Sequence, residues 1–219
     1  MIFLRWLSVA LAAALLIGCG GDGASGRSVV LAIAGCGDAF DSEVGGVVVG
    51  VDRVLTVAHA VVQAGAIEVK GPLGAFSGRV VAVDRRTDLA LVVVDGMGAE
   101  EVLLGAVAQG DTVAVRGGLA SGEVEGEVVE VVDIGIEEVL GTNRVERHGL
   151  RLRAGLVVGD SGAGVFADGA LVGLVFAVNE DGSGTAWATS AREIEALLRG
   201  GEATWTCDPD QSRLVSDQP

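Results

Sequence analysis

Apolar residues in this chain occur mostly in short, valine-rich runs that are bounded by glycine, aspartate or asparagine. β-Branched residues between turn-forming residues are typical of β-strands. The pattern predicts about eleven strands, at residues 44–50, 54–57, 67–70, 76–84, 89–94, 112–116, 127–132, 150–153, 164–166, 170–178 and 184–189. Because no long helical period separates these runs, the chain is predicted to be all-β, as an antiparallel barrel or sandwich.

One short helix is predicted after the last strand, at residues 190–199. Ser190 followed three residues later by Glu193 matches a capping box at its start. Apolar positions 194, 197 and 198 give a helical stripe, and Gly200 is suited to end it. Residues 208–219 are polar and are predicted to be a disordered tail.

The first eighteen residues have the pattern of an export signal. A single cation, Arg5, precedes an apolar stretch that is too short for a transmembrane helix. The segment from Leu16 to Cys19 resembles the lipobox of bacterial lipoproteins, in which the cysteine becomes the lipidated first residue. The resemblance implies an exported, membrane-anchored protein of the cell envelope, on its periplasmic or extracellular face. The alternative is an ordinary secretory signal with a chance cysteine.

Residues 19–34 begin with a glycine-rich stretch and are predicted to be a flexible tether between this anchor and the folded domain. Of the remaining cysteines, Cys36 and Cys207 lie near opposite ends of the predicted domain. Export implies an oxidising compartment, so a disulfide between them is the natural pairing. Two buried thiols are the alternative.

Charge and composition exclude several classes of function. The 219-residue chain carries 15 Lys and Arg against 30 Asp and Glu, a net charge of −15. This charge repels phosphate backbones, so nucleic acid is not an expected partner. His and carboxylate residues do not cluster at ligand spacing, so neither a metal site nor a cofactor is predicted.

Three short motifs each place a reactive side chain at the edge of a predicted strand. They are "VLTVAHAV" with His59, "DRRTDLALVVV" with Asp88 and "GDSGAGVF" with Ser161. Acyl transfer to a hydroxyl needs a base of near-neutral pKa, together with a carboxylate that orients that base. Each residue alone fits a plain structural role in a turn or at a strand end, but their joint occurrence favours a catalytic triad.

These motifs, in the order His, Asp, Ser, resemble the chymotrypsin-like (trypsin-fold) serine proteases. The resemblance covers roughly residues 35–200 and is closest to a compact bacterial branch that includes the HtrA-type proteases and the acid-resistance periplasmic protease of mycobacteria. It implies that His59 is the general base, Asp88 its orienting carboxylate and Ser161 the nucleophile. The backbone N–H groups of Gly159 and Ser161 would form the oxyanion hole.

The resemblance also implies two packed six-stranded antiparallel β-barrels. The domain would span residues 35–207, with the first barrel at about 35–107, the second at about 108–190, and the C-terminal helix after them. A substrate pocket would lie on the second barrel, and none of its implied residues is charged, which favours an uncharged side chain of small or medium size. These residues are Gly155, Phe176, Ala177, Val178, Ala186, Trp187 and Ala188, and the direction of Trp187 is left open.

The chain departs from the family pattern in places. The family usually has "GDSGGP", whereas Ala163 and Gly164 follow the shared residues here. Asp160, which pairs with a newly freed N-terminus in the digestive enzymes, needs another partner, because no matching activation site precedes the domain. The chain also leaves no room for a PDZ domain. His148 is expected to be a surface loop residue without a role.

Together these features predict an exported, lipid-anchored serine endopeptidase that acts on proteins or peptides through an acyl-enzyme intermediate. The main alternative is a catalytically silent binding or scaffold module on the same fold, acting at the cell envelope. An esterase that uses the same residues is a weaker alternative. The chain order of the triad disfavours an α/β-hydrolase.

Overall fold

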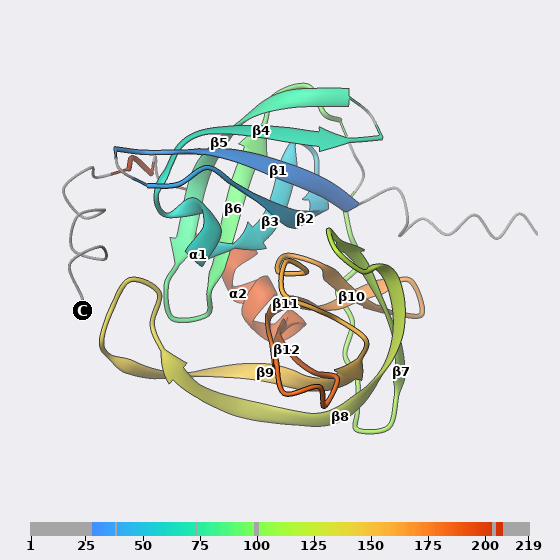
Figure 1. The fold of residues 1–219 in the computed structure, drawn as a ribbon. Coiled ribbons are helices and arrows are strands. Elements are labelled where there is room, and N and C mark those ends of the chain that lie inside the picture. The colour runs from blue at the N-terminus through green and yellow to red at the C-terminus, as the bar shows by residue number, and fades with distance from the viewer. Residues whose placement is uncertain (1–27, 38, 73, 99–100, 203–204, 208–219) are drawn as a thin grey trace, which may run out of the picture.

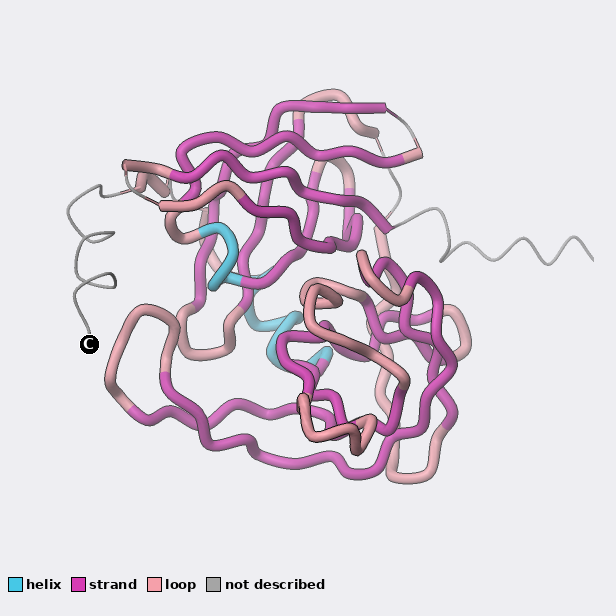
Figure 2. Tube along the Cα trace, in the orientation of Figure 1, coloured by secondary structure: helices cyan, strands magenta, loops and turns pink. Residues whose placement is uncertain are grey.

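The computed structural model describes residues 28–37, 39–72, 74–98, 101–202 and 205–207. Over these residues the chain forms twelve strands and two short helices, and the strands close into two six-stranded antiparallel barrels (Figure 1). Figure 2 shows how little of the trace is helical. The predicted all-β, two-barrel fold is therefore confirmed. The predicted signal, the lipidation site Cys19 and the tail all lie outside the described residues.

The first barrel has the strand order β1-β2-β3-β6-β5-β4. Strands β3 and β6 lie side by side in it and consist almost wholly of buried apolar residues. Val57 pairs with Leu89, so the end of β3 meets the start of β6. The elements are β1 (Ser28–Gly35), β2 (Ser42–Gly50), β3 (Arg53–Val57), the single helical turn α1 (Ala58–Val61), β4 (Ala64–Gly71), β5 (Gly74–Asp84) and β6 (Leu89–Val94).

Strand β1 corrects the prediction that residues 19–34 are a tether, because it occupies the last seven of those positions. Its alternate residues Val29, Leu31 and Ile33 are buried, while Val30 and Ala32 between them are half-buried. β1 pairs with both β2 and β4 and so closes the barrel. Residues 29–34 are all apolar, so the sequence does not distinguish the buried positions from the half-buried ones.

The second barrel has the strand order β10-β11-β12-β9-β8-β7. Strands β8 and β9 are much longer than predicted and form a hairpin that continues beyond the barrel, as Figure 1 shows below the first barrel. The elements are β7 (Thr112–Gly118), β8 (Gly122–Glu137), β9 (Arg144–Ala154), β10 (Gly164–Ala167), β11 (Ala170–Val178), β12 (Thr185–Ser190) and the helix α2 (Ala191–Arg199).

The far end of this hairpin reaches the loop between β5 and β6 of the first barrel. The Val139 N–H donates to the Arg85 carbonyl at 3.1 Å, and Arg85 Nε donates to the Val139 carbonyl at 2.6 Å. Arg85 also pairs with Glu138. The second barrel therefore fixes the loop that precedes β6.

The interface between the barrels is apolar. Four side chains of the second barrel, Phe166, Leu171, Leu174 and Phe176, belong to the same buried cluster as the core of the first barrel. Ile194 of α2 joins this cluster and is fully buried. Burial of this common core holds the two barrels together.

The start of α2 differs from the predicted capping box. The Ser190 hydroxyl makes no cap hydrogen bond. It contacts His148 Nδ1 at 2.6 Å, and the Glu193 carboxylate binds Arg86 and the His148 N–H. Ser190 and Glu193 therefore bind residues from other parts of the fold instead of the backbone N–H groups at the start of α2. His148 is a half-buried residue of β9, so the expectation of a surface loop was wrong.

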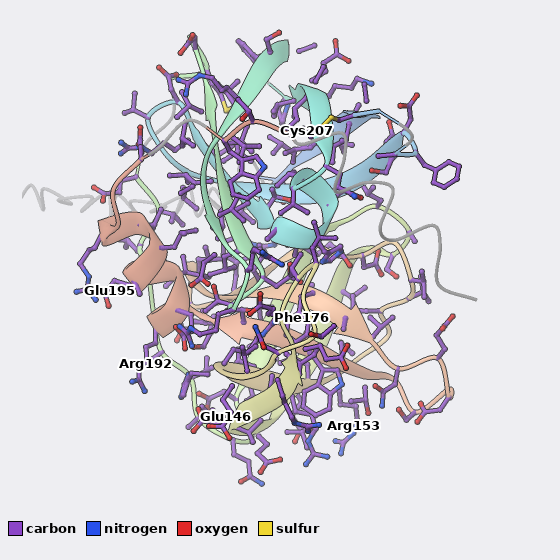
Figure 3. The ribbon with its side chains drawn as sticks, turned by 90° about the vertical axis from the view of Figure 1, so that its left-hand side faces the viewer. Glu146, Arg153, Phe176, Arg192, Glu195 and Cys207 are labelled. Carbon is purple, nitrogen blue, oxygen red and sulfur yellow. A yellow bond between two sulfur atoms is a disulfide. The ribbon has the colours of Figure 1, made fainter. Side chains whose placement is uncertain are left out.

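A disulfide joins Cys36 to Cys207, with 6.4 Å between their Cα atoms, so the expected pairing is confirmed. It ties residues near the two ends of the described chain to each other, and Figure 3 places Cys207 against the first barrel. Among the described residues, no helix has the length and apolar character needed to cross a bilayer.

Candidate active site

His59 and Asp88 lie together because of the pairing of β3 with β6. His59 is in the helical turn that follows β3, and Asp88 is the residue before β6. Asp88 Oδ2 contacts His59 Nδ1 at 2.8 Å, and Asp88 Oδ1 accepts the His59 backbone N–H at 2.8 Å. An ionised carboxylate only accepts hydrogen bonds, so Nδ1 carries the ring proton and Nε2 is left as an acceptor. This is the tautomer that a general base requires.

Asp88 is held in a constrained position. Its side chain is 6% exposed, whereas that of His59 is 43% exposed. Its φ is +59°, a left-handed value that aspartate tolerates better than most residues. The Asp88 carbonyl also accepts the Ala58 N–H at 3.1 Å, which fixes the start of α1. Asp88 therefore orients both the ring and the backbone of His59.

Ser161 lies in a turn that is bonded to both barrels. Its carbonyl accepts the Gly45 N–H of β2 at 3.0 Å, and the Gly162 N–H donates to the Val175 carbonyl of β11 at 2.8 Å. The Ser161 hydroxyl donates to the Phe176 carbonyl at 3.4 Å. Within the part of the chain described, this hydroxyl makes no hydrogen bond to His59. Catalytic hydrogen bonds are often long or misaligned in unliganded sites, so a shift of the hydroxyl would be needed to complete the triad.

The turn before Ser161 presents two unused donors. Among the described residues, neither the Gly159 N–H nor the Ser161 N–H has a protein acceptor. Gly159 adopts a φ of +104°, a conformation that glycine reaches without strain. Two free backbone N–H groups in one turn, such as those of Gly159 and Ser161, can bind the negatively charged oxygen that develops during acyl transfer.

Asp160, between these two residues, binds one N–H group of its own turn and two of the β7–β8 turn. Its carboxylate is fully buried and accepts the N–H groups of Ala120, Ser121 and Val157 at 2.9–3.0 Å. Burial raises the pKa of Asp160, but the Ser121 hydroxyl and these N–H groups outweigh burial, so its pKa lies below the ordinary value. The β7–β8 turn thus takes the place of the freed N-terminus of the digestive enzymes.

His59, Gly159 and Ser161 line one cleft of about 380 Å³. Its opposite wall comes from the loop between β1 and β2 and the start of β2, including Phe40 and Glu43. Phe40 is 93% exposed, so it offers an apolar surface at the mouth of the cleft. Sequence reasoning missed this wall, since nothing in the sequence indicates which loop faces Ser161.

The residues of the predicted substrate pocket are dispersed over both faces of β12 and over the end of β11. Ala186 and Ala188 are fully buried in the core of the second barrel. Trp187 lies between them on the opposite face of β12, and its indole N–H donates to the side-chain oxygen of Asn179. The three neighbours on β12 therefore cannot all line one pocket.

Phe176 is buried and supplies its carbonyl to the Ser161 hydroxyl. Ala177 and Val178 are half-buried, and Gly155 is exposed and accepts the Ser121 hydroxyl through its carbonyl. Which of these side chains would touch a substrate stays a prediction.

The departures from the family motif have a packing reason. Ala163 is fully buried in the core of the second barrel. A Cβ at Gly164 would lie 2.6 Å from the Phe166 ring and 2.7 Å from a methyl group of Val47. Gly164 therefore leaves room for these two side chains. Ala163 ends the turn that carries Ser161, and its N–H donates to the Asp160 carbonyl at 3.2 Å.

A second histidine–serine contact occurs between His148 and Ser190, at 2.6 Å. Its surroundings differ from those of a catalytic pair. Ser190 is 4% exposed, and among the described residues no carboxylate bonds to the His148 ring. The contact ties β9 to the start of α2, so His148 has a structural partner that the sequence did not reveal.

Arg147 is a charged residue beside Asp88 that sequence reasoning missed. It is 1% exposed, and its Nη1 lies 3.8 Å from Asp88 Oδ2. Its neighbours in "NRVERHGLRL" include three other charged residues, so the pattern does not single it out as buried.

The solved structures that resemble this chain include the following three proteases. The active form of the Rv3671c protease from M. tuberculosis has a TM-score of 0.78 and 22% identity, covering 95% of this chain and 98% of that one. The HtrA-type protease AlgW with tripeptide has a TM-score of 0.67 and 19% identity, covering 80% and 60%. The MamO protease domain from Magnetospirillum magneticum has a TM-score of 0.64 and 23% identity, covering 81% and 98%.

At these identities, the likenesses establish the fold alone. No curated protein matches the sequence. The trypsin-like peptidase domain family matches residues 45–174, which is more than half of the 219 residues and includes His59, Asp88 and Ser161. This chain therefore belongs to the trypsin-like peptidase domain family of serine endopeptidases.

Proposed function

We propose that the chain cleaves peptide bonds with Ser161 as nucleophile, His59 as general base and acid, and Asp88 as the orienting carboxylate. The observation that carries the proposal is the pair of hydrogen bonds that His59 donates to the Asp88 carboxylate, at the edge of the cleft that also contains Ser161. It leaves His59 Nε2 as the acceptor for a serine proton.

In the proposed reaction the Ser161 hydroxyl gives its proton to His59 Nε2 while its oxygen attacks the scissile carbonyl carbon. The carbonyl oxygen becomes an oxyanion, which the N–H groups of Gly159 and Ser161 bind. His59 then protonates the leaving amine, and the carbon–nitrogen bond breaks to give an acyl-enzyme. A water molecule, deprotonated by His59, releases the acid product and restores Ser161.

The proposal includes export and lipid anchoring at Cys19. The signal-like pattern of residues 1–18 supports export, and so does the Cys36–Cys207 disulfide, because disulfides persist in oxidising compartments. Incorporation of radioactive palmitate that continued in Cys19→Ser would contradict the anchor. The uncharged residues predicted around the pocket support a substrate side chain that is uncharged and of small or medium size.

Peptide hydrolysis by matched variants tests the proposed function. A library of peptides with uncharged side chains is incubated with the purified domain, and product formation is followed by mass spectrometry. Ser161→Ala and His59→Ala should each reduce the rate at least about 10³-fold, because the members of a triad act as a unit. Ser190→Ala and His148→Gln, which alter the other histidine–serine contact, should stay within about threefold of wild type. Loss of activity in Ser190→Ala, but not in Ser161→Ala, would contradict the assignment.

A catalytically silent binding module is the second candidate. The hydrogen bond from the Ser161 hydroxyl to the Phe176 carbonyl, instead of to His59, favours it. A folded wild-type domain that hydrolyses no peptide of the library would support this second candidate.

A further inference from the structure

Arg147 is a buried cation with few partners. It extends from β9 of the second barrel and is the largest side chain in the described part of the molecule with less than 2% exposure. Its Nη1 donates to the Thr87 carbonyl at 3.2 Å, and within the described residues its Nε has no acceptor. Burying a charge with so few hydrogen bonds is unfavourable, so a purely structural role would be served better by an apolar residue of similar volume.

The position of Arg147 links it to the proposed triad. Its Nη1 lies 3.8 Å from Asp88 Oδ2, the same oxygen that contacts His59 Nδ1. The guanidinium carbon lies 4.7 Å from the centre of the Phe176 ring, and the Phe176 carbonyl accepts the Ser161 hydroxyl. Figure 3 shows Phe176 in the middle of the molecule, between the barrels.

The guanidinium remains charged in this position. Burial lowers the pKa of Arg147, while Asp88 raises it. Burial outweighs Asp88, so the pKa of Arg147 lies below its ordinary value. The ordinary pKa of an arginine is so far above neutrality that Arg147 stays a cation at neutral pH. The other charged groups around it are Asp84 at the end of β5, Arg86 from the same loop as Asp88, and Glu193 from α2.

We propose that Arg147 is a positioning residue that acts on His59 through Asp88. Arg147, which belongs to the second barrel, fixes the position of the Asp88 carboxylate of the first barrel. Its positive charge offsets part of the negative charge of Asp88, which would otherwise favour the protonated form of the His59 imidazole. His59 therefore remains an unprotonated base to lower pH than it would with Asp88 alone. Besides Asp88, Glu43 of β2 is the charged residue on the cleft that His59 lines, and its negative charge opposes this effect.

The inference rests on the proposed function and is tested by the pH dependence of the reaction of Ser161 with a fluorophosphonate. In Arg147→Met the acid limb should move to higher pH by about half a unit, because the cation that opposes protonation is gone. The ratio of wild-type to variant rate should then be about threefold larger at pH 5.5 than at pH 8.5. Arg147→Lys, which keeps the charge, should retain the wild-type limb.

Two further variants serve as controls. Arg153→Met removes an arginine of the same strand that is exposed and pairs with Glu127, and it should leave the profile unchanged. Arg147→Gln is a second neutral variant whose amide can still donate to Thr87, so it replaces Arg147→Met if that variant does not fold. A rate ratio that is equal at both pH values, or a Lys variant that matches the neutral variants, would overturn the inference.

NMR titration of the imidazole signals separates this inference from the proposed function. The chain has two histidines, so the spectrum of His148→Gln assigns the signal of His59. The midpoint of the His59 titration should move upward in the neutral variants, whether or not Ser161 reacts. Wild-type protein that fails to react with the probe would contradict the proposed function alone, whereas an unchanged midpoint would overturn the role of Arg147.

Discussion

Asp160 shows how one buried carboxylate shapes the candidate site. It accepts three backbone N–H groups, one of its own turn and two of the β7–β8 turn. The residues on either side of it, Gly159 and Ser161, present the free N–H groups of the proposed oxyanion hole. The conformation of this turn therefore depends on the charge of Asp160.

Asp160→Asn should lower the free energy of unfolding by about 1–3 kcal/mol at pH 7, because an amide cannot accept the same set of donors. The pKa of Asp160 is depressed in the folded protein, so its contribution is complete above the ordinary carboxyl pKa and is lost as the pH falls through the lower folded value. The difference in the free energy of unfolding between wild type and Asp160→Asn should therefore become smaller below about pH 4. Urea unfolding at pH 7 and pH 3 measures it.

The matched control is Asp168→Asn, since Asp168 is exposed in the β10–β11 turn and asparagine tolerates its positive φ. This variant should unfold like the wild type at both pH values. If Asp160→Asn lowers the free energy of unfolding by the same amount at pH 7 and pH 3, the charge of Asp160 is not the stabilising feature.

At the scale of the elements, the strand that follows Ser161 explains the unusual motif. β10 lies against the first barrel through Phe166, and Gly164 gives that ring its space. The substitutions in "GDSGAG" therefore adapt the strand to its neighbours, and the turn that presents Ser161 keeps its own hydrogen bonds to Gly45 and Val175.

Gly164→Ala should reduce the free energy of unfolding by about 1–3 kcal/mol, because the new methyl group would crowd Phe166 and Val47. Thermal unfolding followed by circular dichroism measures the change. Gly50→Ala is the control, since a Cβ there meets nothing within 4 Å. Equal unfolding temperatures for the two variants would contradict this packing account.

The sequence predicts elements well where the local pattern is strong. The bounds of β6 and β11 agree with the apolar runs 89–94 and 170–178, because both strands are buried over most of their length. β1 was missed because residues 29–34 are all apolar, so the sequence does not separate its buried positions from the others. The outer parts of β8 and β9 were missed because glycines interrupt the alternation in β8 and a charged residue occupies the buried position 147 in β9.

Contacts between residues that are distant in the sequence could not be predicted from it. The capping box at Ser190 failed because His148 and Arg86, which are distant in sequence, compete for the same side chains. Arg147 was missed for a related reason, since burial of a charge depends on the loop that packs over it. The spacing of His59, Asp88 and Ser161 is preserved by strand pairing and by a family pattern, so these residues could be placed from the sequence.

At the scale of the whole molecule, the candidate site depends on the relative position of two barrels. His59 and Asp88 belong to the first and Ser161 to the second (Figure 1). The long β8–β9 hairpin, the apolar interface and the disulfide all connect distant parts of the chain. The disulfide also fixes Cys36, which is close in sequence to Phe40 at the mouth of the cleft.

Reduction of the Cys36–Cys207 disulfide should lower the thermal unfolding temperature by about 10 °C. The bond joins residues 171 positions apart, and closure of so long a loop stabilises a protein by roughly 3–5 kcal/mol in the chain-entropy model. Scanning calorimetry with and without a reductant measures the shift, and the double variant Cys36→Ser/Cys207→Ser should not respond to the reductant. An unchanged temperature for the wild type would show that the bond does not stabilise the fold.

The central claim is that Ser161 is an activated nucleophile, and the most direct test is to locate a fluorophosphonate adduct on the protein by peptide mass spectrometry. We predict one adduct per chain, on Ser161, with none in His59→Ala. An adduct on Ser190, or labelling of Ser161 that persists in His59→Ala, would contradict the claim.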